Sequence, residues 1–293
     1  MRSFIIKIKD SILISFNLLR VKQYVKNLLI FAPCFFGVKL IGFDVFQSLF
    51  VAFIGFCFIT SFIYILNDIK DREFDKFHPS KKDRPIASDK ISIKSAFLIA
   101  AFCLIIGLFL LKNAIWVVLS YLLLNFLYIF LLKKIAIIDI ICVAFGYVLR
   151  LFVGSVVYPQ VELSHWIIIM TFLLALFLVA SKRYDDVQYS DENIRECIKD
   201  YSKEFLTCLM SVLVAIIIIA YILYTLSSNV IEFFNCDYLY ITSIFVLVGI
   251  LRYLQLTIVY NSSTSPTNIV YNDNIIKVSI VLWILSFLWI LYL

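Results

Sequence analysis

Long apolar runs with few or no charged residues constrain the fold of this chain more than any other feature. Residues 46–66, for example, contain no Asp, Glu, Lys or Arg. About 20 apolar residues are needed for an α-helix to cross the hydrocarbon core of a bilayer. Such runs recur, and we expect spans near residues 28–42, 46–66, 93–111, 114–132, 138–157, 166–181, 205–226, 239–256 and 275–293. The sequence therefore predicts an all-α membrane protein with about nine transmembrane helices.

The composition excludes an ordinary soluble domain. The chain is 63% hydrophobic and only 16% charged, whereas soluble domains are closer to half apolar. Its seven cysteines are scattered and mostly lie within the apolar runs, as expected of small apolar side chains that fill space. We expect a single polytopic membrane domain over residues 26–293. Residues 1–25 mix charged and apolar side chains at helical spacing, which predicts an amphipathic segment at the membrane interface.

The basic residues predict the orientation in the membrane. Lys and Arg cluster in residues 2–26, 70–94, 133–134 and 182–203, whereas residues 158–165 and 227–237 contain neither. Cytoplasmic loops carry the excess of basic residues. We therefore expect a cytoplasmic amino terminus in a bacterial inner membrane, with the polar loops that carry the chemistry on the cytoplasmic side. The same bias accounts for the net charge of +6, so no nucleic-acid partner is inferred.

A group of polar residues begins where the run over residues 46–66 ends. Asn67, Asp68, Asp71 and Asp75, together called the acidic box here, follow it directly. If the helix continues, offsets of three and seven residues place the three aspartates on one face. Mg²⁺ is bound by one or two carboxylates together with water and substrate phosphates. The acidic box therefore predicts a magnesium site, with a solvated acidic helix end as the alternative.

Basic residues accompany the acidic box and begin a second polar loop. Lys81 and Arg84 share the loop of the acidic box, and Lys182, Arg183 and Tyr184 open the later one. Carboxylates for a metal, combined with basic side chains, suit a metal-bound phosphate ester, because Lys and Arg can bind the remaining phosphate oxygens. The alternative for the later pair is the basic flank of a membrane helix.

Arg150 lies deep in the fifth apolar run, with Asp139 eleven residues earlier. A charged group in such a position costs roughly 3 kcal/mol or more unless it faces a polar cavity or a partner. We expect Arg150 to point inward. A substrate role and a structural role as a buried charge between helices both remain open.

Several motifs resemble those of the UbiA-type prenyltransferase superfamily, which are intramembrane enzymes of nine helices. The first is Asn-Asp-x-x-Asp-x-x-x-Asp at residues 67–75, followed by Arg-Pro-Ile at residues 84–86. Within that superfamily the chain is more similar to the decaprenyl-phosphate phosphoribosyltransferases. The segments that carry this similarity are residues 23–27, 78–81, 132–134, 139–140, 150, 182–184 and 252–253.

The resemblance implies a UbiA-like bundle with a central cavity open to the cytoplasm and the bilayer. It also implies transfer of 5-phosphoribose from 5-phosphoribosyl 1-diphosphate to a polyprenyl phosphate, with Mg²⁺ as cofactor. Aromatic prenyltransferases of the superfamily carry a second Asp-x-x-x-Asp box after the sixth span. This chain has Lys-Arg-Tyr-Asp-Asp at residues 182–186 instead, which favours a donor with more than one phosphate group.

The resulting site hypothesis assigns Asp68, Asp71 and Asp75 to catalysis and Asn67 with Asp71 to the metal. The expected substrate-binding residues are basic, apart from one tyrosine: Lys26, Lys81, Arg84, Lys134, Arg150, Lys182, Arg183 and Tyr184. The phosphates of the donor and the head of the lipid are their expected ligands. An aromatic prenyltransferase of the 4-hydroxybenzoate type, or a transporter without enzyme activity, are the alternatives, and a homo-oligomer is left open.

Overall fold

The computed structural model describes residues 14–37, 42–77, 81–188, 196–260 and 266–292. Every regular element in these ranges is a helix. The helices form two compact units. Unit 1 comprises residues 1–133, 146–163 and 191–194, and unit 2 comprises residues 134–145, 164–190 and 195–293. The interfacial segment over residues 1–25 and the single membrane domain over residues 26–293 stay predictions, since residues 1–13 lie outside the described ranges.

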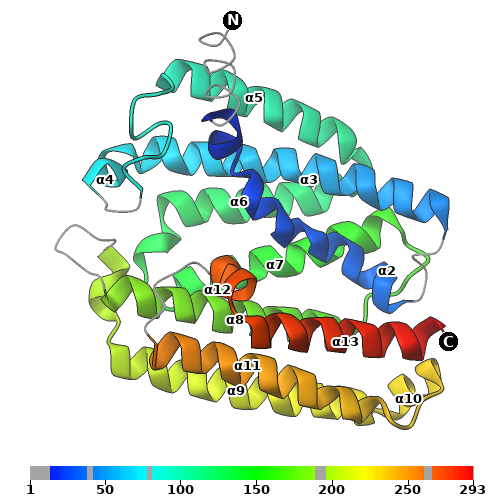
Figure 1. Ribbon diagram of the computed structural model, residues 1–293. Helices are drawn as coiled ribbons and strands as arrows, with labels where there is room; N and C mark the ends of the chain where they lie inside the picture. The colour runs from blue at the N-terminus through cyan, green and yellow to red at the C-terminus, as the bar shows by residue number, and fades with distance from the viewer. Residues whose placement is uncertain (1–13, 38–41, 78–80, 189–195, 261–265, 293) are drawn as a thin grey trace, which may run out of the picture. The chain divides into compact units, whose positions relative to one another are not determined.

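In unit 1, the long helix α3 (Phe43–Lys70) packs along α5 (Ile93–Leu110) (Figure 1). Ser92 caps α5 by accepting a hydrogen bond from the amide of Ser95 at 3.1 Å. Two glycines allow the close approach of the two helices. A Cβ atom on Gly107 would lie 2.6 Å from Cδ1 of Ile59, and one on Gly55 would lie 2.9 Å from Cβ of Leu110. Helices can approach this closely because glycine has no side chain at the crossing.

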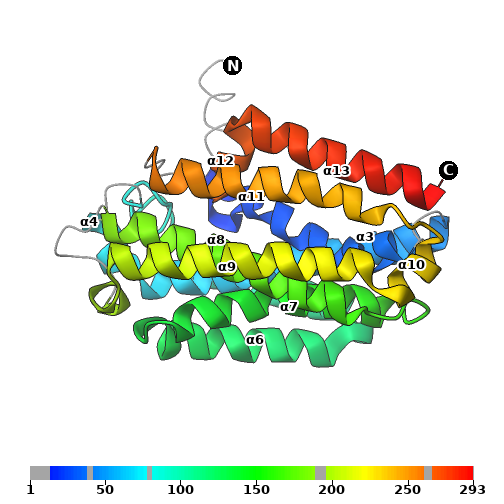
Figure 2. The same ribbon diagram turned by 90° about the horizontal axis from the view of Figure 1, so that it is seen from below.

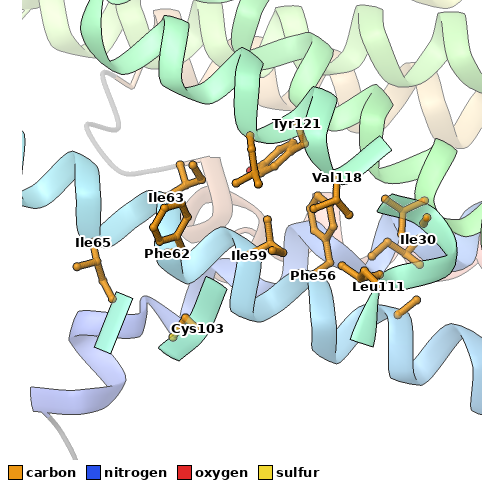
Figure 3. Close-up of a cluster of buried hydrophobic side chains, with 14 of the residues drawn as sticks. Ile30, Phe56, Ile59, Phe62, Ile63, Ile65, Cys103, Leu111, Val118 and Tyr121 are labelled. Atoms are coloured by element: carbon orange, nitrogen blue, oxygen red, sulfur yellow. The ribbon is translucent and has the colours of Figure 1, made fainter. Parts of the chain in front are cut away.

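The buried core of unit 1 joins α3 to α6 (Ile115–Phe130) and to the segment before α3. Figure 3 shows Phe56 and Ile59 of α3 in one cluster with Val118 and Tyr121 of α6. The rings of Phe56 and Tyr121 lie 4.8 Å apart between centroids. By contrast, the outer faces of α5 and α6 expose large apolar side chains such as Leu98 and Trp116. Such faces suit contact with lipid rather than with water.

The expected first span over residues 28–42 differs from what the structure shows. A 3₁₀-helix, η1 (Val21–Phe31), is followed by a short α-helix, α2 (Ala32–Phe36). A 3₁₀-helix rises about 2.0 Å per residue and an α-helix about 1.5 Å. The two elements therefore extend roughly 30 Å, close to the thickness of the hydrocarbon core. The segment begins at Val21, earlier than expected, and the 3₁₀ conformation lets it cover this length with fewer residues than an α-helix would need.

Unit 2 is a bundle around α8 (His165–Gln188), α9 (Lys203–Leu226), α11 (Ser243–Ile258) and α13 (Asn274–Tyr292). α9 packs on α8 and α11, and α11 packs on α13 (Figures 1 and 2). Ser202 caps α9 by accepting from the amide of Phe205 at 3.1 Å. The short helices α10 (Ser228–Phe234) and α12 (Pro266–Asn272), with η4 (Glu196–Asp200) and η5 (Leu239–Thr242), connect these helices.

Seven described helices are long and apolar enough to cross a membrane, which makes the chain a multi-pass integral membrane protein. They coincide with expected spans two to eight and include α7 (Ile138–Val157), whose first turns belong to unit 2 and whose remainder belongs to unit 1. The last expected span corresponds to α13, of which Asn274–Ile290 counts as a shorter apolar helix. The total of nine stays a prediction.

Candidate active site

The acidic box lies at the end of α3, in unit 1. α3 ends at Lys70, Asp71 occupies its C-cap position, and α4 (Arg72–Phe77) follows directly. The amide of Asp71 donates to the carbonyl of Asn67 at 2.9 Å, and that of Asp75 donates to the carbonyl of Asp71 at 2.8 Å. Asp68 and Asp75 are buried, with 2% and 4% of their surface exposed. The turn thus keeps the acidic box together at one end of the helix.

Basic side chains from three separate segments reach these carboxylates. Nη1 of Arg84 donates to Oδ1 of Asp68 at 3.1 Å and to Oδ2 of Asp75 at 2.5 Å. Arg20 donates a second bond to the same oxygen of Asp68, and Lys133 donates to Asp71. Burial and the neighbouring Arg20 lower the pKa of Arg84, whereas the two carboxylates act in the opposite direction. The acidic box is therefore neutralised from within unit 1.

The donor set fits a hard divalent cation by its chemistry. Asp68 and Asp75 meet at a single nitrogen atom of Arg84, so two carboxylates already converge on one point of positive charge. Within the described ranges, no group of three or more His, Cys, Asp or Glu side chains has the arrangement of a metal site. The three carboxylates are instead paired with basic side chains. Lys133 forms an ion pair with Asp71, and Arg84 forms ion pairs with Asp68 and Asp75.

Arg150 is buried in unit 1, 4% exposed, and bonded to neutral groups. Its Nε donates to Oδ1 of Asn27 at 3.0 Å, and its Nη2 donates to the hydroxyl of Tyr121 at 3.2 Å. The rings of Phe56, Tyr121 and Tyr147 lie 5.2–5.4 Å from its guanidinium carbon. The inward orientation expected for Arg150 is present. None of the ion pairs between described residues involves Arg150, so the cluster carries positive charge.

Arg183 lies in a different environment, in unit 2. Its Nε donates to Oδ2 of Asp139 at 2.5 Å, and its Nη1 donates to Asp186 at 2.8 Å. The hydroxyl of Tyr201 donates to the other oxygen of Asp139 at 2.7 Å. Asp139 and Arg183 are 0% and 2% exposed. The structure thus gives Arg183 a buried structural partner, and Asp139 lies with Arg183 rather than with Arg150.

The remaining expected substrate residues are distributed over both units. In unit 1, the Lys26 ammonium lies 5.9 Å from the ring centroid of Tyr147, near the Arg150 cluster. Lys81 is half-buried in the loop of the acidic box. In unit 2, Lys134 and Lys182 are exposed and Tyr184 is buried. Residues 78–80 of the first motif lie outside the described ranges.

The sequence interpretation did not select Arg20 or Lys133. In the sequence, Arg20 is one of several basic residues near the amino terminus. Lys133 lies beside Lys134 in the motif at residues 132–134, and the site hypothesis includes Lys134 only. One structural signal marks Arg20: its φ of 53° and ψ of 46° place it in the left-handed region. This conformation is unusual for a residue with a side chain and commonly marks a constrained position.

Comparison with known proteins extends over nearly the whole chain. Residues 29–281 match the UbiA prenyltransferase family. The decaprenyl-phosphate phosphoribosyltransferase of Mycolicibacterium smegmatis is 28% identical over 282 residues, which covers 90% of this chain and 88% of that protein. The protein of the same name from Corynebacterium glutamicum is 28% identical over 286 residues, covering 94% and 86%.

Solved structures show the same fold. A UbiA homologue from Archaeoglobus fulgidus bound to DMAPP and Mg²⁺ superimposes with a TM-score of 0.71 at 19% identity, covering 94% of this chain and 98% of that one. A UbiA homologue from Aeropyrum pernix superimposes with a TM-score of 0.68 at 10% identity, covering 93% and 98%. The fold, the membrane helices and the range of residues matched by the family model all indicate the same family. This chain is a member of the UbiA prenyltransferase family.

Proposed function

We propose that this protein transfers 5-phosphoribose from 5-phosphoribosyl 1-diphosphate to a polyprenyl phosphate. The products are pyrophosphate and a polyprenyl-phosphoryl-5-phosphoribose. The observation that carries the proposal is the similarity, over about nine-tenths of the chain, to relatives named decaprenyl-phosphate phosphoribosyltransferase. The single acidic box, surrounded by basic side chains in unit 1, supports it.

Asn67, Asp68, Asp71 and Asp75 are the residues that would hold Mg²⁺. When bound, the ion neutralises charge on the diphosphate and makes pyrophosphate a better leaving group. We assign the phosphate oxygens of the donor to Arg84 and Lys81, which share the loop that follows the acidic box. Basic groups that stabilise the charge of a departing diphosphate act most strongly in a site that excludes water.

The acceptor requires no general base, because a phosphate monoester is already ionised at neutral pH. An oxygen of the lipid phosphate attacks the anomeric carbon, the bond to the diphosphate breaks, and the electron pair leaves with pyrophosphate. Buried Arg150 and half-buried Lys26 both lie beside the ring of Tyr147, and this positive cluster suits the head of a lipid phosphate. A buried cation that is hydrogen-bonded to neutral acceptors gains most from an anionic ligand.

Lys134, Lys182 and Tyr184 stay predictions as substrate ligands. The ion pair of Arg183 with Asp139 supports a positioning role for that arginine. We also place the chain in a bacterial inner membrane with the acidic box on the cytoplasmic side, where soluble sugar phosphates are available. Decaprenyl phosphate or a related lipid is the proposed acceptor.

A second candidate is prenyl transfer to an aromatic acid. The observation in its favour is that solved structures of this fold contain DMAPP or GPP with Mg²⁺. The two candidates differ in the donor, since only one of the donors is a sugar.

The test compares the two donor–acceptor pairs in separate assays. Purified protein in detergent or nanodiscs is given radiolabelled 5-phosphoribosyl 1-diphosphate with decaprenyl phosphate, or radiolabelled geranyl diphosphate with 4-hydroxybenzoate. We expect a labelled, lipid-extractable product from the first pair only, and none after EDTA treatment or in Asp71→Asn. Product from the second pair alone would assign the protein to the aromatic prenyltransferases and contradict the proposal.

A further inference from the structure

The three carboxylates of the acidic box pair with three basic side chains within unit 1. Arg20 and Arg84 bind Asp68, Arg84 also binds Asp75, and Lys133 binds Asp71. A divalent cation held by these aspartates would compete for the same carboxylate oxygens. Breaking an ion pair that is largely buried is costly in free energy unless both charged groups gain new partners.

We propose that Arg20, Arg84 and Lys133 are exchangeable counter-ions. They neutralise the acidic box, and they transfer to the diphosphate oxygens of the donor when a divalent cation takes their place on the carboxylates. This assigns Arg20 and Lys133 as donor-binding residues in addition to Arg84. The proposal rests on the proposed function only in requiring a donor with a diphosphate group.

The position of Arg20 supports this assignment. Its left-handed backbone lies between a helical segment at residues 14–19 and η1. The hydroxyl of Ser61 on α3 donates to the carbonyl of Leu19 at 3.0 Å and pairs with the hydroxyl of Tyr24 at 2.7 Å. These bonds fix both flanks of Arg20 on α3. A left-handed residue other than glycine costs about 1–2 kcal/mol, so the surrounding contacts hold Arg20 in place over the acidic box.

Arg20 and Lys133 are partly exposed to solvent, as an exchange of partners requires. The side chain of Arg20 is 22% exposed and that of Lys133 is 13% exposed, whereas Asp68 is 3% exposed. The guanidinium carbon of Arg20 also lies 4.9 Å from the ring centroid of Tyr64. This ring contact keeps the arginine beside α3 when its carboxylate is engaged elsewhere. In the first pair the arginine reaches solvent and the carboxylate does not, and in the second pair both Lys133 and Asp71, at 13% and 17%, are partly exposed.

Exchange makes two predictions of opposite sign for the same substitution. In Arg20→Met and Lys133→Met, a competitor of the divalent cation is removed. The affinity for Mn²⁺ alone should therefore rise by roughly fivefold or more, given the strength of charged hydrogen bonds after partial solvent screening. A phosphate ligand is removed as well. The affinity for pyrophosphate in the presence of Mg²⁺ should fall by roughly tenfold or more.

The experiment measures both affinities on purified protein without any sugar donor, with Mn²⁺ followed by electron paramagnetic resonance and pyrophosphate by calorimetry. Lys133→Arg should restore both affinities. Lys90→Met, an exposed lysine of the loop after the acidic box, is the matched control and should change neither. Thermal unfolding midpoints show which variants are folded, and the two Lys133 variants carry the test if Arg20→Met does not fold.

Two results would overturn the exchange. If neither Met variant binds Mn²⁺ more tightly, the basic groups do not compete with the cation. If Mn²⁺ binding tightens while pyrophosphate binding stays at the wild-type value, the basic groups are fixed counter-ions. Since the probes are Mn²⁺ and pyrophosphate, the exchange can hold even if the donor assay assigns the protein to prenyl transfer. The two proposals therefore fail separately.

Discussion

Two buried aspartates of unit 2 differ in how fully their carboxylate oxygens are hydrogen-bonded. Asp139 accepts hydrogen bonds from Arg183 and Tyr201. Asp185 is 9% exposed, and its Oδ1 atom has no hydrogen-bond partner in the described structure. A buried charge is tolerated when it is paired, and removing one partner of such a pair leaves the other uncompensated. The two carboxylates should therefore respond differently to the same substitution.

Asp139→Asn should lower the free energy of unfolding by about 3 kcal/mol, because it removes the fully buried carboxylate from the Arg183 ion pair and leaves that buried guanidinium with the less buried Asp186. Asp185→Asn should change it by less than about 1 kcal/mol, or raise it, because an unpartnered buried oxygen is already unfavourable in the native state. Thermal unfolding in detergent measures both. Equal losses in the two variants would show that Asp185 has a partner comparable to Arg183.

The residue types of the site can be predicted from the sequence better than the ion pairs that these residues form. The aspartates at residues 67–75 were selected because carboxylates at helical spacing next to an apolar run are conspicuous. Arg20 and Lys133 were missed because a basic residue at a membrane edge is ordinarily explained by the charge bias of cytoplasmic loops. Asp139 and Arg183 are 44 residues apart, and no pattern in a single sequence shows such a pairing. Long-range ion pairs depend on tertiary packing.

At the scale of helices, the apolar runs predicted the positions of the long spans but not the form of the first one. η1 is a 3₁₀-helix that packs beside α7 in unit 1, where a Cβ atom on Gly154 would lie 2.0 Å from the carbonyl oxygen of Ile30. Hydropathy measures only length and apolarity, so it does not distinguish a 3₁₀-helix from an α-helix. Because Gly154 has no side chain, η1 can approach α7 closely at this position.

Gly154→Ala should be poorly tolerated, because its new methyl group meets backbone rather than a side chain that can rotate. We expect a loss of roughly 1–3 kcal/mol or more in the free energy of unfolding, as for other overpacked cores. Gly249→Ala in α11 is the matched control, since the nearest atom to its Cβ, on Ser279, would be 3.6 Å away. Unfolding midpoints and yields in detergent compare the two. Similar midpoints would mean that η1 can shift away from α7 at little cost.

At the scale of the whole molecule, the distribution of charge predicts which side of the membrane each loop occupies. The loop after α4 is rich in Lys and Arg, whereas residues 227–237, which include α10, contain neither. Asp83 and Asn229 are exposed positions in these two segments. Cytoplasmic loops carry the basic residues, so Asp83 should face the cytoplasm and Asn229 the outside. Both sites can be tested with cysteine and a maleimide that does not cross membranes.

The test uses Asp83→Cys and Asn229→Cys in a background in which Cys208 and Cys236, the cysteines that are not buried, are replaced by serine. In intact cells stripped of their outer barrier, the reagent should label the cysteine at residue 229 at once. The cysteine at residue 83 should be labelled only after the membrane is permeabilised. The orientation matters for the chemistry, because the acidic box lies on the same side as residue 83, directly after α3. Immediate labelling at residue 83 would place the acidic box outside the cell, away from cytoplasmic sugar diphosphates, and would contradict the proposed donor even though the fold would be unchanged.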